Sequence, residues 1–253
     1  MAPLPTVLVL GDGDFAFSAR LAAAGTHAVT ATTIETEDEV VARYPMTFPS
    51  HRRAILQHGG VCVFSVDATR LEGRLLTHAG MERRFTRVVF NNPYTAGVEK
   101  GTHRAHKAAK THQKLVRDFI VGVHHVLCDG PDSRVVVSLN PSPLATVGAS
   151  ILLRAAALAG LHLLREYPFS EGGRTHQYVL RFGDARDLDR GGEVRRKTYA
   201  KRGIRTYEFG VGSGLTAELE GWHGGVDDGE TEGEMAGGGR RREAEENPGD
   251  SEP

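Results

Sequence analysis

The stretch Thr6-Val-Leu-Val-Leu-Gly-Asp-Gly-Asp-Phe-Ala16 decides the fold class of this 253-residue chain. Its first five residues form an apolar run that is typical of a strand buried on both faces of a parallel sheet. Gly11 and Gly13 then allow a tight turn and a close approach of a ligand to the backbone. A helix follows over residues 15–24. Strand, glycine turn and helix together predict the first unit of an α/β nucleotide-binding sheet.

The same alternation of strand and helix continues along most of the chain, which predicts a mostly parallel sheet with helices on both faces. Further strands are expected over residues 28–33, 60–66, 85–90 and 134–139, and helices over residues 35–44, 69–78, 115–127 and 144–160. Residues 161–169 and 176–182 then predict a closing antiparallel hairpin across Gly172-Gly173. A seven-stranded sheet of this kind is typical of the Rossmann-like class I methyltransferase fold.

The sequence predicts three regions, namely a methyltransferase domain over 1–182, a basic extension over 183–212 and an acidic, Gly- and Glu-rich disordered tail over 213–253. One more short strand is expected over 205–209 within the extension. The formal net charge of −1 conceals an asymmetry, since residues 215–253 carry 12 acids against 3 arginines and the rest carries +8. A basic globular part with an acidic tail is common in proteins that handle polyanions, although a solvated surface would also account for it.

Several classes of protein are disfavoured by composition. No apolar run approaches the ~18 residues that a membrane span needs, and the run before Gly11 is too short for a signal peptide. Cys62 and Cys128 lie far apart in the sequence, which disfavours a disulfide framework or a cysteine-based zinc site. His103, His106 and His112 fit no zinc-binding spacing. We therefore expect no metal and no membrane partner, and a reducing compartment.

Acidic residues follow the first three predicted strands, at the edge where ligands of parallel sheets bind. A carboxylate at Asp12 would repel a pyrophosphate, whereas it suits the cationic S-adenosylmethionine (SAM). Glu35 is placed to accept hydrogen bonds from ribose hydroxyls and Asp67 from an adenine amino group, although each could instead stabilise a helix start. The residues expected to bind the cofactor are Gly11, Asp12, Gly13, Asp14, Phe15, Ser18, Glu35, Asp67 and Ala68.

A candidate catalytic loop, Asn91-Asn92-Pro93-Tyr94, follows the fourth predicted strand. It is similar to the Asn-Pro-Pro-Tyr motif of methyltransferases that act on planar nitrogen. In that motif the asparagine and a proline carbonyl accept hydrogen bonds from the target nitrogen, and the aromatic ring stacks on a flipped base. Basic residues after this loop and in the extension predict RNA contacts. The residues concerned are Lys100, Arg104, Lys107, Lys110, Lys114, Arg195, Arg196 and Lys197.

Taken in order, these segments resemble the eukaryotic 25S rRNA (uridine-N3)-methyltransferase family. The likeness is carried by residues 10–18, 31–37, 44–45, 66–69, 90–94, 112–113 and the segment around His176, and it spans roughly residues 6–182. It implies SAM as methyl donor, N3 of a uridine in large-subunit rRNA as target, an rRNA or pre-ribosomal partner, and a nucleolar location, with the cytoplasm as the alternative. The family usually has Phe-Asn-Phe-Pro-His-Thr-Gly, so Asn92 and Tyr94 depart from it.

Two other functions stay open on the sequence alone. A non-catalytic RNA-binding module could retain the fold with an altered fourth motif. A NAD(P)-dependent oxidoreductase would share the glycine turn and Glu35. No general base is evident, and His112 is a candidate through the family resemblance alone.

Overall fold

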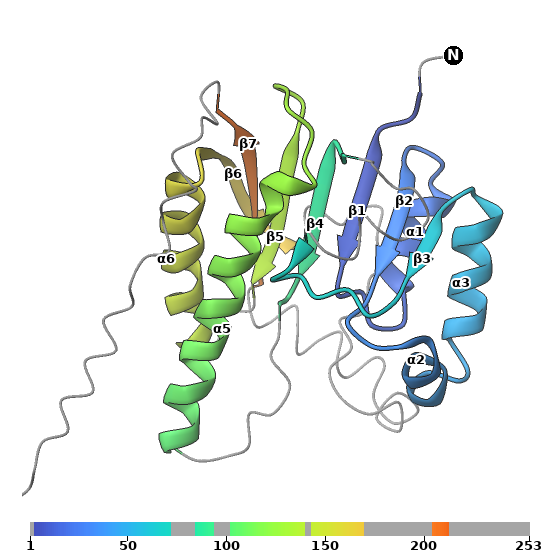
Figure 1. Ribbon diagram of the computed structural model, residues 1–253, viewed down its shortest axis with the longest axis horizontal. Helices are drawn as coiled ribbons and strands as arrows, with labels where there is room; N and C mark the ends of the chain where they lie inside the picture. The colour runs from blue at the N-terminus through green and yellow to red at the C-terminus, as the bar shows by residue number, and fades with distance from the viewer. Residues whose placement is uncertain (1–2, 72–83, 94–101, 140–142, 170–203, 213–253) are drawn as a thin grey trace, which may run out of the picture. The chain divides into compact units, whose positions relative to one another are not determined.

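The computed structural model describes residues 3–71, 84–93, 102–139, 143–169 and 204–212 (Figure 1). In chain order the elements are β1 (Thr6–Leu10), α1 (Ala16–Ala23), β2 (Ala28–Thr32), α2 (Glu37–Arg43), α3 (Phe48–Gln57), β3 (Val61–Val63), β4 (Arg87–Asn91), α5 (Thr102–Gly122), the 3-10 turn η1 (Val123–His125), β5 (Arg134–Leu139), α6 (Pro143–Leu158), β6 (Leu161–Pro168) and β7 (Arg205–Val211). Within these residues, no helix combines the length and the apolar character that crossing a membrane requires.

The seven strands form one sheet in the order β3-β2-β1-β4-β5-β7-β6. β1 to β5 pair in parallel, while β7 runs antiparallel to both of its neighbours, β5 and β6. The order reverses between β1 and β4, which lie side by side with Leu10 opposite Phe90. In open α/β sheets ligands bind outside the carboxyl ends of the strands at such a reversal. The loops after β1 and β4 are therefore the first place to look for a site.

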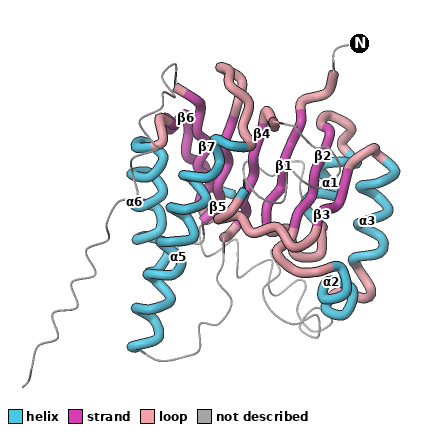
Figure 2. Tube along the Cα trace, viewed as in Figure 1, coloured by secondary structure: helices cyan, strands magenta, loops and turns pink. Residues whose placement is uncertain are grey.

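Helices cover the sheet on both faces, with α5 and α6 on one face and α1 and α3 on the other (Figures 1 and 2). β1 is apolar along almost its whole length because its successive side chains enter opposite cores. Leu8 and Leu10 pack with the α5 and α6 core, whereas Val7 and Val9 pack with the α1 and α3 core. β1 is thus anchored in both cores, and the glycine turn follows directly from its end.

The predicted mostly parallel, seven-stranded sheet with a closing antiparallel pair is confirmed. The partner of β6 is β7, however, and the strand expected over 176–182 lies outside the described residues. The short strand anticipated over 205–209 is thus an inner strand of the sheet, between β5 and β6. Helix α3 was not predicted, and β3 is shorter than the expected strand. The expected helix over 69–78 lies mostly outside the described residues.

Candidate active site at the carboxyl ends of β1 to β5

Gly11 makes the turn after β1 in a backbone conformation that other residues rarely adopt. Its φ is +63°, and a Cβ atom here would lie 3.1 Å from Cε2 of Phe90 on β4. Both the left-handed conformation and the close approach of β4 require glycine. The backbone of Gly11 is exposed at the edge of the sheet, so a ligand can approach it.

Asp12 turns its carboxylate inward onto the first turn of α1. Oδ2 accepts a hydrogen bond from the Ser18 amide at 2.7 Å and Oδ1 one from the Phe17 amide at 3.4 Å. Burial raises the pKa of this carboxyl to about 7, against the lowering effect of the hydrogen bonds from Ser18. The amides at the start of a helix are the usual anchors of a pyrophosphate. Since Asp12 already occupies them, the turn is poorly suited to a dinucleotide.

Asp14 and Phe15 also face inward and support the turn. The Thr47 hydroxyl donates to Asp14 Oδ2 at 2.9 Å, and His51 lies 2.9 Å from the Asp14 carbonyl oxygen. Phe15 adopts a left-handed φ of 62°, and its fully buried ring packs on Phe48 with centroids 5.7 Å apart. These supporting contacts come from α3 and the residue before it, which the sequence patterns did not reveal.

Glu35 lies just beyond β2, and its carboxylate is largely shielded from solvent at the same edge of the sheet. Its side chain is 13% exposed, and Oε1 forms an ion pair with Arg43 at 2.7 Å. Burial raises the pKa of Glu35, while the Arg43 guanidinium opposes that rise. Tyr44 is buried close by, with its hydroxyl 3.4 Å from the position that a Cβ atom of Gly13 would take. An acid in this place can accept hydrogen bonds from ribose hydroxyls.

Asp67 and Ala68 follow β3, and main-chain hydrogen bonds tie this loop to the end of β2. The Ser65 amide donates to the Glu35 carbonyl and the Val66 amide to the Thr33 carbonyl, both at 2.9 Å. Asp67 Oδ1 accepts from the amide and the hydroxyl of Thr69, at 2.8 and 2.7 Å. One oxygen of Asp67 thus caps the local turn. These main-chain hydrogen bonds hold Glu35 and Asp67 in fixed relative positions, which a preorganised site requires.

The end of β4, the residue after it and α5 bring together buried polar atoms that have no partner among the described residues. Within that part of the chain, Asn91 Nδ2, both side-chain polar atoms of Asn92, and His112 Nδ1 make no hydrogen bond. Asn92 has a left-handed φ of 49°, a conformation that asparagine tolerates better than most residues. Because unsatisfied buried polar groups are costly, such a cluster indicates a place built for a ligand. Tyr94 lies outside the described residues.

His112 on α5 contacts the backbone of the loop after β4 through a hydrogen bond. Its Nε2 lies 2.9 Å from the carbonyl oxygen of Pro93, and burial lowers the pKa of the imidazole against that hydrogen bond. A neutral imidazole that donates from Nε2 leaves Nδ1 unprotonated. The geometry therefore identifies His112 as a residue that positions the Pro93 backbone.

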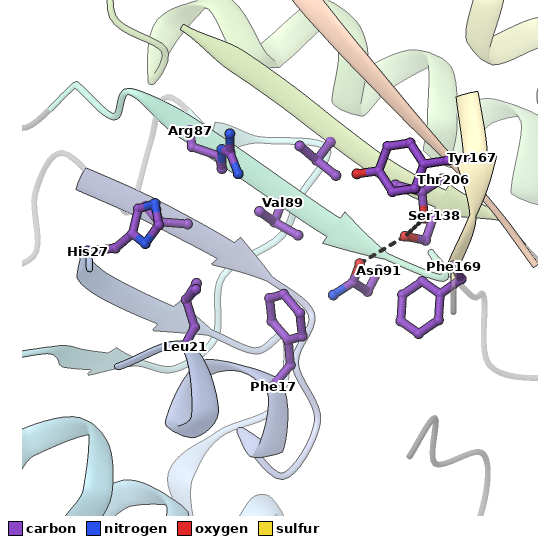
Figure 3. A pocket seen from close by; sticks show the side chains of 12 residues that line it. Phe17, Leu21, His27, Arg87, Val89, Asn91, Ser138, Tyr167, Phe169 and Thr206 are labelled. Carbon is purple, nitrogen blue, oxygen red and sulfur yellow. Dashed lines mark hydrogen bonds between the residues drawn. The ribbon is translucent and has the colours of Figure 1, made fainter. Parts of the chain in front are cut away.

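A cavity of about 110 Å³ opens beside Asn91 on the face of the sheet that α1 partly covers (Figure 3). This is room for more than a single water molecule. Its wall nearest the carboxyl ends of the strands includes Phe17, Asn91, Ser138, Phe169 and Thr206. Of these five residues, Asn91 was predicted from the sequence to have a role. The others escaped notice because they come from four separate segments that meet only in the folded sheet.

The predicted RNA-binding residues are only partly described. Lys110 and Lys114 are exposed on α5, and Lys114 forms an ion pair with Asp118 at 2.7 Å. Arg117 also pairs with Asp118, so the acid just after the basic run offsets part of its charge. The side chains of Arg104 and Lys107, and residues Lys100, Arg195, Arg196 and Lys197, lie outside the described part of the chain.

The strand order, with an antiparallel β7 between β5 and β6, and a glycine turn with acids after β2 and β3, define a class I SAM-dependent methyltransferase fold. Residues 8–177, more than half of the chain, match the family model described as "rRNA (uridine-N3-)-methyltransferase BTM5-like". The chain therefore belongs to the BMT5-like family of rRNA (uridine-N3)-methyltransferases. This membership implies SAM as the cofactor.

Two curated relatives come from Arabidopsis thaliana. The uncharacterized protein At4g26485 is 28% identical over 123 residues, which cover 48% of this chain and 57% of that protein. Heavy metal-associated isoprenylated plant protein 41 is 32% identical over 124 residues, which cover 48% of this chain and 23% of that protein. The matches thus span less than two thirds of either relative. Among solved structures, the 16S rRNA methyltransferase KamB aligns at 13% identity and a TM-score of 0.47, over 82% of this chain and 88% of its own.

Proposed function

We propose that this protein transfers a methyl group from SAM to N3 of a uridine in large-subunit rRNA. One observation carries the proposal beyond family membership. The glycine turn after β1 adjoins Asn91-Asn92-Pro93 after β4, because Leu10 and Phe90 are opposite each other in the sheet. The cofactor side and the candidate target side of the site therefore meet at the reversal of strand order, where a methyl group could pass between them.

On the cofactor side, the residues present fit SAM. The Gly11 backbone is open to a ligand, Glu35 offers a carboxylate to ribose hydroxyls, and Asp67 has one oxygen that is not committed to the Thr69 turn. When bound, SAM would supply an electrophilic methyl group on a sulfonium sulfur. The chain itself contributes position, and holding two reactants in line accounts for a large part of such a rate enhancement.

On the target side, we propose that Asn91 contacts the uracil edge and that the cations of α5 contact the RNA backbone. Lys110 is exposed on this helix, and α5 begins shortly after the Asn91 loop. Phosphate contacts of this type supply much of the affinity of proteins for RNA without reading its sequence. We also propose that the protein works in the nucleolus, where large-subunit rRNA is made; the family likeness and the charge pattern support this.

The inward carboxylate of Asp12 weighs against the oxidoreductase alternative. It already accepts hydrogen bonds from the amides of Phe17 and Ser18 at the start of α1. A dinucleotide would need to displace this carboxylate before its pyrophosphate could use the same donors. SAM has no phosphate and makes no such demand.

Calorimetric titration of the purified full chain with SAM, and separately with NADH, tests the cofactor. We expect micromolar binding of SAM and none of NADH. Glu35→Gln should weaken SAM binding roughly tenfold because it replaces one of two acceptor oxygens by an NH2 group, which cannot accept from a ribose hydroxyl. Glu37→Gln is the matched control, since Glu37 pairs with Arg52 on the surface and its variant should bind SAM normally. NADH binding without SAM binding would favour the oxidoreductase instead.

The reaction is tested with large-subunit rRNA transcribed in vitro, which carries no modification. After incubation with full-length protein and SAM, mass spectrometry of the nucleoside digest should detect 3-methyluridine. Asn91→Ala should abolish it while leaving SAM affinity nearly intact. A folded wild-type protein that binds the transcript but forms no methylated nucleoside at any salt concentration would identify a non-catalytic RNA-binding module.

A further inference from the structure

Three polar side chains form a row across the sheet at the Asn91 end of the cavity. Asn91 on β4 is the register partner of Ser138 on β5, which is the partner of Thr206 on β7. The Ser138 hydroxyl donates to Asn91 Oδ1 at 3.1 Å, and the Ser138 and Thr206 hydroxyls are 3.0 Å apart. Ser138 and Thr206 are both buried. A buried polar row of this kind is costly unless it is fully hydrogen-bonded.

The direction of this hydrogen-bond chain follows from counting hydrogens. Among the described residues, Ser138 is the one hydrogen-bond partner of the Thr206 hydroxyl. If Thr206 donates to Ser138 and Ser138 donates to Asn91 Oδ1, each hydroxyl hydrogen has an acceptor. The reverse direction would require Asn91 to accept nothing from Ser138 and would leave the Thr206 hydrogen without an acceptor among the described residues, which is unfavourable. The chain therefore runs from Thr206 to the carbonyl oxygen of Asn91.

This direction fixes which end of the Asn91 amide is available to a ligand. With Oδ1 held by Ser138, the amide nitrogen lies on the side away from Ser138, between the rings of Phe17 and Phe169 as seen in Figure 3. Nδ2 is buried and has no hydrogen-bond partner in the described part of the chain. Asn91 therefore presents an N–H donor, the opposite of the acceptor role that the Asn-Pro-Pro-Tyr likeness suggested.

We infer that Asn91 donates a hydrogen bond to the C4 carbonyl beside N3 of a uracil ring, and that Ser138 and Thr206 orient Asn91 for this contact. This inference rests on the proposed function. A donor fits this carbonyl and meets the C4 amine of cytosine or the C6 amine of adenine unfavourably. It also assists the reaction, because N3 loses its proton and the resulting charge spreads onto O4. A donor aimed at the atom where charge develops stabilises the transition state, and the proton leaves to solvent.

The decisive variant is Asn91→Asp, which keeps the shape of the side chain and replaces the donor by an acceptor. It is assayed on two large-subunit rRNA transcripts that differ by uridine or cytidine at the nucleotide that the wild-type protein methylates. We expect uridine methylation to fall roughly 100-fold, and the ratio of 3-methylcytidine to 3-methyluridine to rise roughly tenfold or more. In cytidine the N3 lone pair attacks directly, so no proton has to leave.

A second pair of variants tests the positioning row. Thr206→Val removes the hydroxyl at constant shape and should lower uridine methylation roughly tenfold, with its pH–rate profile displaced to higher pH and SAM affinity unchanged. Thr206→Ser keeps the hydroxyl and should retain the wild-type profile. The pH displacement separates positioning from a purely structural effect.

The outcomes distinguish this inference from the proposed function. If the wild-type protein forms 3-methyluridine but Asn91→Asp keeps the wild-type rate, or loses uridine methylation without a change in the cytidine ratio, the reading of the C4 carbonyl is wrong. An unchanged pH profile in Thr206→Val would remove the positioning role of the row. If the wild-type protein forms no 3-methyluridine on either transcript, the proposed function fails and the inference fails with it.

Discussion

At the scale of single residues, Asp12 combines burial with a structural role. Its carboxylate is almost inaccessible to water, yet it holds the first turn of α1 through two main-chain amides. Burial raises its pKa from 3.8 to about 7, so the native protein keeps a proton that the unfolded chain releases above pH ~4.

The contribution of Asp12 to stability should therefore decrease as the pH rises from about 4 to about 7. In this window the native state binds more protons than the unfolded state, which makes the slope of unfolding free energy against pH negative, by up to about 1.4 kcal/mol per pH unit. Urea unfolding at pH 5 and pH 7.5 measures it. We expect wild type to lose about 2 kcal/mol relative to Asp12→Asn over this range. If the free energies of unfolding of wild type and Asp12→Asn change equally with pH, the raised pKa of Asp12 is contradicted.

Individual residues were predictable where chemistry is local in sequence. The glycine turn, Glu35 and Asp67 each follow a strand directly, so the strand pattern alone places them at one edge. The inward direction of Asp12 and Asp14 was not predictable, because it depends on how the turn packs on α1 and on contacts from Thr47 and His51. Ser138 and Thr206 could not be recognised, since only the register of β4, β5 and β7 brings them to Asn91.

At the scale of secondary-structure elements, one carboxylate connects four strands. Glu208 on β7 is buried and binds Arg165 on β6 at 2.6 Å, with Arg87 on β4 at 3.6 Å and Arg134 on β5 at 3.7 Å. Because β7 is the last strand in the chain and lies between β5 and β6, this cluster stabilises a pairing between residues that are far apart in the sequence.

Replacing Glu208 by Gln should destabilise the protein by about 1–3 kcal/mol, since the buried Glu208 side chain would lose the charge that binds three partly exposed arginines. Thermal and urea unfolding at pH 7 measure the loss. Glu166→Gln is the matched control. Glu166 on β6 pairs with Arg205 on β7 but is 37% exposed. Its replacement should therefore change stability by less than about 0.5 kcal/mol. If Glu208→Gln and Glu166→Gln lower the free energy of unfolding equally, the contacts of Glu208 with three arginines contribute no more than an exposed ion pair.

At the scale of the whole molecule, charge is divided unevenly along the chain. Residues 215–253 carry a net charge of −9 and the preceding residues +8. Deleting 215–253 should therefore tighten binding to rRNA transcripts and steepen the fall of affinity with salt, because the acidic segment no longer competes with phosphates. Filter binding at 50 and 200 mM KCl checks this. SAM affinity should stay unchanged, and an unaltered salt dependence would mean that the tail does not act on RNA binding.

The position of β7 has a consequence for how the protein is made. β7 is the neighbour of β5 in the sheet, but 65 residues, 140–204, separate the two strands in the sequence. At roughly 5–20 residues per second, a ribosome needs several seconds to synthesise that interval. Throughout it, the nascent chain carries β5 with one edge unpaired, and exposed strand edges recruit other chains. Slower synthesis over 140–204 therefore lengthens the time for which this edge of β5 stays unpaired, and faster synthesis shortens it.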